Sequence, residues 1–367
     1  MQNILYYYSH HHFDTGSPKA LVGIIELIDR SKYKPYFLAT GYGPLIKELS
    51  ERNVKILTAQ VNRIRFLNIL KTLYNAIVLL ILLKKHNIKL IHINEYGINY
   101  DLVLAAKLCG IPITLHIHNP EDLRICNFHT FLADNVFLVS NAVSEAVIGY
   151  EKIKNKSTLL YNYVNVSNIQ KGYNIRVNLG FSKEDILVGV IGQITPEKGT
   201  DLLIKVAENL IKIYPNLHFI FAGRTGENQE RFLKKTIKYI NKKKLNKNIH
   251  ILGIRNDIPN ILASINLFCL ATKAETFCIA LVEAMAAGLP IIASAVGAIP
   301  ELMSNNGILI YEHNIKKFCK QIAWLIDNPK IAKKFGKKAK ESIKGRLDKN
   351  ICFTQLHSTY DLLIKKT

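Results

Sequence analysis

Two glutamates that stand eight residues apart, Glu275 and Glu283, frame a segment of otherwise small and apolar residues. Strong helix formers fill this segment, Thr276 suits the N-cap and a Gly-Leu-Pro sequence ends it, so we expect a buried helix over about 277–287. Eight helical residues separate two backbones by about 12 Å, whereas the two acids of a glycosidase need carboxyl groups roughly 5 to 9.5 Å apart. The pair is therefore expected to hold different parts of one long ligand. The alternative is a helix with one exposed and one incidental acid.

The same two glutamates match the E-x7-E motif of the retaining GT-B glycosyltransferases of family 4, which the chain resembles. Other segments follow the family pattern, strongly at 268–275, 288–294 and 297–301, and more weakly at 111–118, 134–140, 161–165 and 192–199. The resemblance implies two Rossmann-like doubly wound domains that face a cleft, with a C-terminal helix that crosses back to the N-terminal domain. It also implies transfer of a sugar from a nucleotide-diphosphate sugar.

The phosphate site that this resemblance implies lies at the start of the expected helix. The backbone N–H groups of Phe277, Cys278 and Ile279 would face the donor diphosphate, beside Thr276. Helix N-termini favour anions because their first N–H groups lack partners within the helix. The family usually has glycine at positions 276 and 278, so the approach to the phosphates differs here. We interpret Cys278 as a packing residue, since nothing near it in the sequence resembles a general base.

Two cations are candidates for the same diphosphate. Lys198 precedes Gly199 and an expected helix start, where a cation opposes the helix dipole unless it faces a bound anion. The family commonly has a second cation where this chain has Gln193. Arg224, which follows another expected strand, is our candidate to replace it.

The remaining site residues are assigned by the resemblance. Glu283 is expected to accept hydrogen bonds from the ribose hydroxyls, and Glu275 to position the transferred sugar and stabilise an oxocarbenium-like transition state. His118 matches the family histidine that contacts the donor sugar or phosphate. Gly16, in a loop after the first strand, could let backbone approach phosphate or acceptor. Arg255 is a candidate neighbour of the nucleotide base.

We predict neither a metal ion nor a cofactor. The chain has no Asp-x-Asp motif, so a metal-bridged diphosphate is not expected and the counter-charge would come from helix N-termini and basic side chains. The expected partners are a nucleotide-diphosphate sugar and a glycan or lipid-linked acceptor of surface polysaccharide or lipopolysaccharide synthesis.

The elements that must position these residues are visible as apolar runs that alternate with helical patterns, which is typical of α/β domains with parallel sheets. We predict domains at 1–165, completed by a C-terminal helix at about 350–367, and at 180–349, for acceptor and donor respectively. The expected strands are 3–8, 36–40, 54–57, 90–94, 113–117 and 136–139, then 186–191, 217–221, 249–252, 267–270, 291–293 and 308–310.

Composition narrows the partners and the compartment. The net charge is +21 over 367 residues, which suits either an anionic membrane surface or lysines on solvated helix faces. No basic segment interleaved with aromatics indicates nucleic acid, so we expect none. Six cysteines without a C-x-x-C pair, most of them inside apolar runs, argue against a disulfide framework and a zinc site. We therefore expect a cytoplasmic protein, with peripheral attachment to the inner face of the cell membrane as the alternative.

The longest uncharged stretch, Thr72 to Leu83, is too short for the roughly 20 residues that cross a bilayer. We expect a buried helix of the first domain there. The alternative is an apolar face that docks on a bilayer together with Lys71, Lys84 and Lys85.

Other functions fit the same scaffold. A nucleotide-sugar 2-epimerase-type isomerase would need further acids and bases around the sugar, for which we find no convincing set. A catalytically silent homologue that binds nucleotide sugar is suggested by Gln193 and Thr276. An NAD-linked oxidoreductase is disfavoured because no Gly-x-Gly-x-x-Gly follows either first strand.

Overall fold

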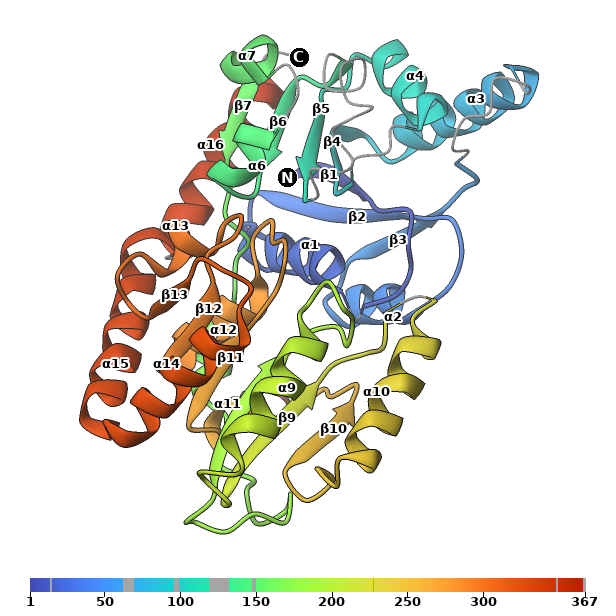
Figure 1. Cartoon of the computed structure of the whole chain (residues 1–367). Coiled ribbons are helices and arrows are strands. Elements are labelled where there is room, and N and C mark those ends of the chain that lie inside the picture. The colour runs from blue at the N-terminus through green and yellow to red at the C-terminus, as the bar shows by residue number, and fades with distance from the viewer. Residues whose placement is uncertain are drawn as a thin grey trace. The chain divides into compact units, whose positions relative to one another are not determined.

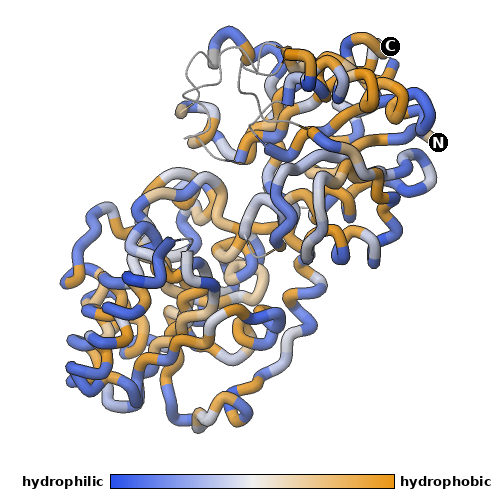
Figure 2. Tube along the Cα trace, turned by 90° about the vertical axis from the view of Figure 1, so that its right-hand side faces the viewer, coloured by the Kyte–Doolittle hydropathy of each residue, from blue (hydrophilic) through white to orange (hydrophobic). Residues whose placement is uncertain are grey.

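The computed structural model describes residues 1–13, 15–61, 69–95, 99–118, 132–146, 150–226, 228–347 and 349–365. The chain divides into two compact units, each built on a parallel sheet (Figure 1). Unit 1 consists of Met1–Tyr163 and Lys349–Thr367, and unit 2 of Val164–Asp348. Hydrophobic and hydrophilic stretches alternate along the trace in both units (Figure 2).

Unit 1 is a doubly wound α/β domain. Its sheet has the strand order β3-β2-β1-β4-β5-β6-β7, and every pairing in it is parallel. The strands are β1 (Gln2–Tyr7), β2 (Tyr33–Ala39), β3 (Lys55–Thr58), β4 (Ile88–Ile93), β5 (Ile113–Ile117), β6 (Asn135–Leu138) and β7 (Ser157–Leu159). The helical segments are α1 (Gly16–Leu27), α2 (Pro44–Glu51), α3 (Ile69–Lys85), α4 (Tyr100–Leu108), α6 (Asn141–Ala146), α7 (Tyr150–Ile153), the 3-10 helix η2 (Lys154–Lys156) and α16 (Lys349–Lys365).

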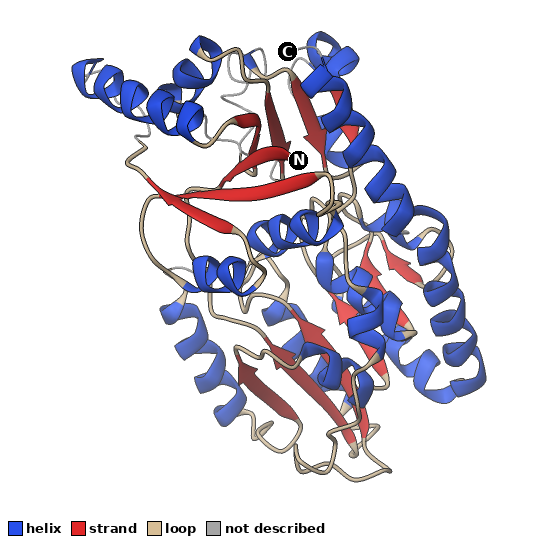
Figure 3. Ribbon diagram, turned by 180° about the vertical axis from the view of Figure 1, so that it is seen from behind, coloured by secondary structure: helices blue, strands red, loops and turns tan. Residues whose placement is uncertain are grey.

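The C-terminal helix α16 completes the core of unit 1, as expected from the resemblance (Figure 3). Tyr360 of α16 is fully buried, and its hydroxyl lies 2.8 Å from Nδ1 of His92 on β4. At the surface, the Asp361 carboxylate pairs with Lys32 and accepts a hydrogen bond from the Tyr33 hydroxyl. In the sequence α16 follows the whole of unit 2, yet it packs in unit 1 and helps to bury the core of that unit.

Unit 2 repeats the architecture with the parallel strand order β10-β9-β8-β11-β12-β13. Helices α9 and α14 contact each other over one face, while α12 contacts α8, α11 and α15. The strands are β8 (Ile186–Ile191), β9 (Leu217–Ala222), β10 (Ile249–Gly253), β11 (Leu267–Leu270), β12 (Ile291–Ser294) and β13 (Ile308–Ile310). The helices are α8 (Val166–Gln170), α9 (Thr200–Leu210), α10 (Glu230–Lys242), α11 (Ile258–Ser264), α12 (Ile279–Ala287), α13 (Ile299–Met303), α14 (Ile315–Asp327) and α15 (Pro329–Arg346).

Sequence patterns located the strands well because both faces of a parallel sheet are covered and its strands are near-continuous apolar runs. Four-residue strands such as β6 and β11 are buried at every position. The edge strand β7 was missed, because its three residues are half-buried and carry two hydroxyls. The stretch 72–83 is helical, but the expectation of a buried helix was wrong, since only one side of α3 is covered.

Candidate functional site

The strand order of unit 2 reverses direction between β8 and β11, and ligands of open α/β sheets bind outside the carboxyl ends of the strands at such a point. The loop after β8 carries Lys198, and the loop after β11 carries Glu275. The two loops are joined by backbone: the N–H of Lys273 donates to the carbonyl of Glu197 at 2.8 Å. Two of the predicted site residues therefore meet at the place where a ligand is expected.

Lys198 and Glu275 form an ion pair between the Nζ atom and Oε1. The side chains are 28% and 10% exposed respectively. Burial alone would lower the pKa of Lys198, but the neighbouring Glu275 carboxylate outweighs it and the pKa is raised. Each charge is thus paired with the other at a largely buried position, where an isolated charge would raise the free energy of the folded protein. A lysine held in this way can exchange the carboxylate for an incoming phosphate without ever being left buried and unpaired.

Gly297 fixes the backbone of Glu275 from the loop after β12. The carbonyl of Glu275 accepts a hydrogen bond of 3.2 Å from the N–H of Ala298. Gly297 has a left-handed backbone (φ +51°), and a Cβ atom built on it would lie 1.7 Å from the carbonyl oxygen of Glu275. Only glycine lets the two backbones approach this closely.

We expect Gly297→Ala to destabilise the protein and to impair any activity that depends on Glu275. The left-handed backbone alone costs a non-glycine residue about 1–2 kcal/mol, and the collision with Glu275 adds to it. A displacement of about 1 Å at a reacting group can cost about a hundredfold in rate. Gly180→Ala is the matched control, because Gly180 is also left-handed (φ +82°) with nothing within 4 Å of the added Cβ. Equal losses of unfolding free energy in urea titrations of the two variants would contradict the packing role of Gly297.

The helix between the two glutamates, α12, begins at Ile279, two residues later than expected. Its N-cap is Cys278 with a left-handed backbone (φ 71°), so the expectation of Thr276 as N-cap was wrong. A left-handed conformation is unfavourable for a residue with a Cβ, and such strain persists where the surroundings impose it. Burial, aided by the nearby Glu275 carboxylate, raises the pKa of the Cys278 thiol well above its ordinary value. A neutral thiol is a poor nucleophile, which agrees with a packing role.

The other predicted residues of α12 and its approach lie in the same unit. Phe277 is 2% exposed, so its side chain belongs to the core and only its backbone could contact a ligand. Thr276 and Glu283 are half-buried. Gly288 ends the helix with a left-handed backbone (φ 75°), as its position after the apolar run predicted.

Arg224 and Arg255 are held by different contacts. The carbonyl of Arg224 accepts a hydrogen bond of 2.8 Å from the N–H of Ile194, so its loop runs beside that of Gln193. Arg255 instead makes a two-pronged contact with Asp257, at 2.8 Å from Nε to Oδ1 and 2.7 Å from Nη2 to Oδ2. Of the two arginines, only Arg224 is tied by its backbone to the loop that precedes Lys198.

Unit 1 has its own switch point, between β1 and β4, and polar residues gather there. Glu95, which follows β4 and is 8% exposed, accepts hydrogen bonds from the N–H and hydroxyl of Ser9 at 3.1 and 2.5 Å. The adjacent Asn94 donates through Nδ2 to the carbonyl of Ser17 at 2.9 Å. Gly16 lies beside Ser17 as the exposed first residue of α1, rather than in a loop as the sequence suggested.

Asn94 also orients the predicted His118, whose Nε2 lies 3.0 Å from the Asn94 Oδ1 atom. Because the Asn94 amide nitrogen already donates to Ser17, its oxygen must accept, which assigns the proton of neutral His118 to Nε2. Burial lowers the pKa of His118 to about 3. The imidazole is therefore neutral at physiological pH, and its Nδ1 atom carries the lone pair.

Sequence reasoning missed Ser9, Asn94 and Glu95. Asn94 is the last residue of the strand predicted at 90–94 and Glu95 follows it, so a search for polar residues at and just after the end of each strand would have found them. Ser9 gives a weaker signal, because serine is common after strands.

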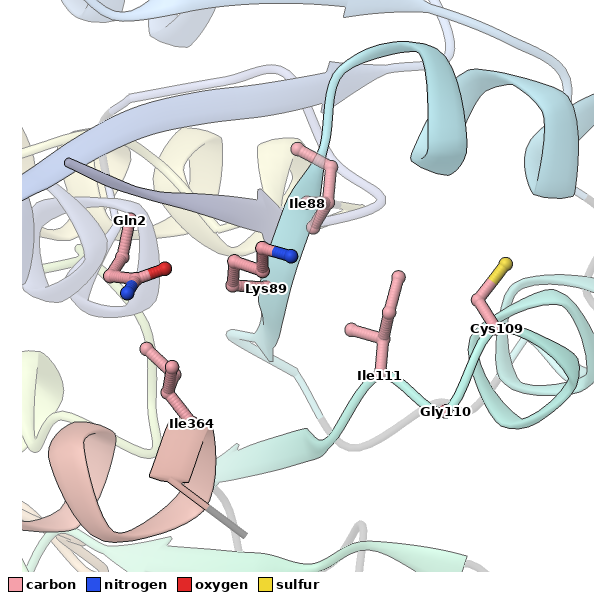
Figure 4. A pocket seen from close by; sticks show the side chains of 7 residues that line it. All are labelled: Gln2, Ile88, Lys89, Cys109, Gly110, Ile111 and Ile364. Carbon is pink, nitrogen blue, oxygen red and sulfur yellow. The ribbon is translucent and has the colours of Figure 1, made fainter. Parts of the chain in front are cut away.

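A cavity of about 300 Å³ in unit 1 lies away from the predicted site residues (Figure 4). Its lining includes the starts of β1 and β4, at the amino ends of the strands, so it is on the opposite edge of the sheet from His118. The residues that line it are Gln2, Ile88, Lys89, Cys109, Gly110, Ile111 and Ile364. It contains none of the predicted site residues.

Comparison with known proteins identifies the family. Residues 173–342 match the model described as Glycosyl transferases group 1, and residues 19–168 match the model described as Glycosyltransferase Family 4. The Escherichia coli UDP-Gal:alpha-D-GlcNAc-diphosphoundecaprenol alpha-1,3-galactosyltransferase is 24% identical over 338 residues, which cover 86% of this chain and 85% of that protein. One component of the human phosphatidylinositol N-acetylglucosaminyltransferase is 24% identical over 236 residues, 62% of this chain and 47% of that protein. The match thus spans less than half of the human protein.

A solved structure extends the likeness to the whole fold. The Anabaena protein HepE in complex with UDP and glucose superposes with a TM-score of 0.84 at 20% sequence identity, over 98% of this chain and all of that one. Two Rossmann-like domains with this topology are the GT-B fold.

Proposed function

This chain belongs to the group 1 glycosyl transferases, and from that membership we propose that it transfers a sugar from a nucleotide-diphosphate sugar to a glycan or lipid-linked acceptor. The proposed reaction retains the anomeric configuration and needs no metal ion. The observation that carries this proposal is the Lys198–Glu275 pair at the switch point of unit 2. It joins a cation that suits a diphosphate to a carboxylate that suits a sugar.

In this proposal the donor diphosphate lies against the start of α12. The N–H of Ile279, the first residue of α12, lacks an acceptor within the helix and so favours an anion. Lys198 turns from Glu275 to the diphosphate, and Arg224 supplies the second cation that Gln193 does not. Glu275, released from its partner, faces the transferred sugar and stabilises positive charge that develops at its anomeric carbon.

The other residues hold the two ends of the donor and the acceptor. Glu283 accepts hydrogen bonds from the ribose hydroxyls, and Arg255 borders the base. From unit 1, the neutral His118 accepts a hydrogen bond through Nδ1 from a sugar hydroxyl, and Gly16 lets backbone approach the phosphate or the acceptor. Because a HepE structure contains UDP, uridine nucleotides are the first donors to test.

The experiment incubates the full chain with UDP, GDP and ADP sugars in the presence of EDTA, and follows nucleotide release and product structure. Transfer that continues in EDTA with an α-linked product from an α-linked donor supports the proposal. Turnover that requires a divalent ion would contradict the metal-independent site. A free epimer formed without acceptor would indicate an isomerase, and donor binding by calorimetry without turnover on lipid-linked and glycan acceptors would indicate a silent homologue.

A further inference from the structure

The outer side of α3 is apolar along most of its length. The side that packs on unit 1 carries Asn75, Ala76, Leu79 and Leu83. The exposed apolar side chains are Ile69, Leu70, Leu73, Tyr74, Ile77, Val78 and Ile81, with Leu70 83% and Ile77 59% exposed. Their spacing places them on one continuous face of the helix. Large apolar patches on a protein surface mark interaction sites.

The covered side of α3 packs on unit 1 through a buried polar contact. Asn75 is buried and donates to the carboxylate of Asp101 on α4 at 3.3 Å. Asp101 is fully buried and also accepts the N–H of Leu102 at 2.9 Å. The helix therefore turns a polar contact inward while its apolar side chains face outward. A neighbouring helix, α4, exposes Leu104 and Leu108 one turn apart.

The charged residues of α3 are all lysines. Exposed Lys71 lies at the margin of the apolar face, and exposed Lys84 and Lys85 stand in the last turn of the helix. No acidic residue occurs in α3. Long lysine side chains can bury their stems and keep their ammonium groups at a phosphate level. An apolar face with a cationic rim is the pattern of helices that lie in the interface of an anionic bilayer.

We propose that the outer face of α3, comprising the seven apolar side chains with Lys71, Lys84 and Lys85, docks on an anionic lipid bilayer. The helix lies in the plane of the interface and does not cross it: its 17 residues extend about 25 Å, and none of the described helices has the length and hydropathy of a membrane span. This inference rests on the proposed function in one respect, because it would bring the enzyme to a lipid-linked acceptor.

A second copy of this chain suits the face less well. If two α3 helices paired antiparallel, Lys71 of one copy would lie beside Lys84 and Lys85 of the other. A parallel pairing would place each lysine beside its own counterpart. Either arrangement opposes like charges without an acid on the helix to offset them, whereas anionic headgroups complement all three.

The test is co-sedimentation of the full chain with vesicles of phosphatidylcholine alone and vesicles in which about a third of the lipid is phosphatidylglycerol. We expect binding to the anionic vesicles. The apolar variant Leu73→Gln/Ile77→Gln/Ile81→Gln, whose side chains face solvent, should fold normally by circular dichroism and bind at least about tenfold more weakly.

The charge variant and its control separate this face from the general charge of the protein. Lys84→Gln/Lys85→Gln should weaken binding to anionic vesicles by up to about thirtyfold. The matched control is Lys337→Gln/Lys338→Gln, an equal loss of exposed charge on α15 of unit 2. We expect the control variant to bind almost as the unaltered protein does.

Several outcomes would overturn the proposal. The first is that the apolar variant binds anionic vesicles as well as the unaltered protein does, or that the unaltered protein does not bind them. The second is that the α15 control loses more vesicle binding than Lys84→Gln/Lys85→Gln does. The third is that the unaltered protein is a dimer in solution, which the apolar substitutions convert to monomers. Donor binding measured by calorimetry without vesicles should be the same in all variants. If the unaltered protein did not bind the donor, this would contradict the proposed function but not the membrane contact.

Discussion

Lys198→Met is expected to lower kcat/KM for sugar transfer by about a thousandfold, because removal of one preorganised electrostatic contact to a transition state costs about a hundredfold to a thousandfold. The methionine keeps an apolar stem of similar length, so the change tests the charge. It also leaves Glu275, which is 10% exposed, without its partner. Stability should therefore fall as well, by less than the 3–5 kcal/mol of a fully buried pair, since Lys198 is 28% exposed.

A double variant distinguishes loss of catalysis from loss of stability. Lys198→Met/Glu275→Gln removes both charges, so it should recover most of the unfolding free energy while transfer stays low. Lys205→Met is the control, because Lys205 is exposed on α9 of the same unit. If Lys198→Met transferred sugar at the rate of the Lys205 variant, the proposed diphosphate contact would be wrong.

Acidification should destabilise unit 1 steeply below about pH 6.5. Burial lowers the pKa of His92 and of His118 to about 3, and that of His116 well below its ordinary value. The three rings lie together, with centroids 5.5 Å apart for His92 and His116 and 4.2 Å for His116 and His118. Protonation of any of them would place a charge among apolar and aromatic groups.

The sign follows from proton binding. Between about pH 6.5 and pH 3 the unfolded chain holds protons on these histidines that the folded unit does not, so the unfolding free energy falls as the pH falls. Each histidine contributes at most about 1.4 kcal/mol per pH unit, and the three together about 4 kcal/mol. Urea denaturation from about pH 7.5 to pH 5 measures this slope.

His116→Asn tests the origin of that slope. Both ring nitrogens of His116 are buried with no hydrogen-bond partner among the described residues, so the variant removes one of the buried bases. The pH dependence of its unfolding free energy should be shallower by about one proton. An unfolding free energy that stays level across this pH range would show that the histidines are solvated or protonated in the folded protein.

Local patterns were enough to predict the elements that position the site. The strands are continuous apolar runs, and the Gly-Leu-Pro sequence after the apolar segment set the end of α12 correctly. The start of α12 was not predictable in this way. Cys278 adopts a left-handed backbone that few residues choose by themselves, and residues distant in sequence, such as Gly297 against Glu275, shape the loops around it.

The sequence by itself determined the fold class, the strand runs and the two glutamates eight residues apart, because apolar periodicity and residue spacing are properties of short segments. Only the tertiary structure decided that Lys198 meets Glu275 across 77 residues, that Asn94 sets the tautomer of His118, and that the outer side of α3 stays exposed. On α3 both sides are largely apolar, so periodicity could not distinguish the covered side from the exposed one. Contacts between distant segments depend on how sheets and helices pack, and no short window of sequence contains that information.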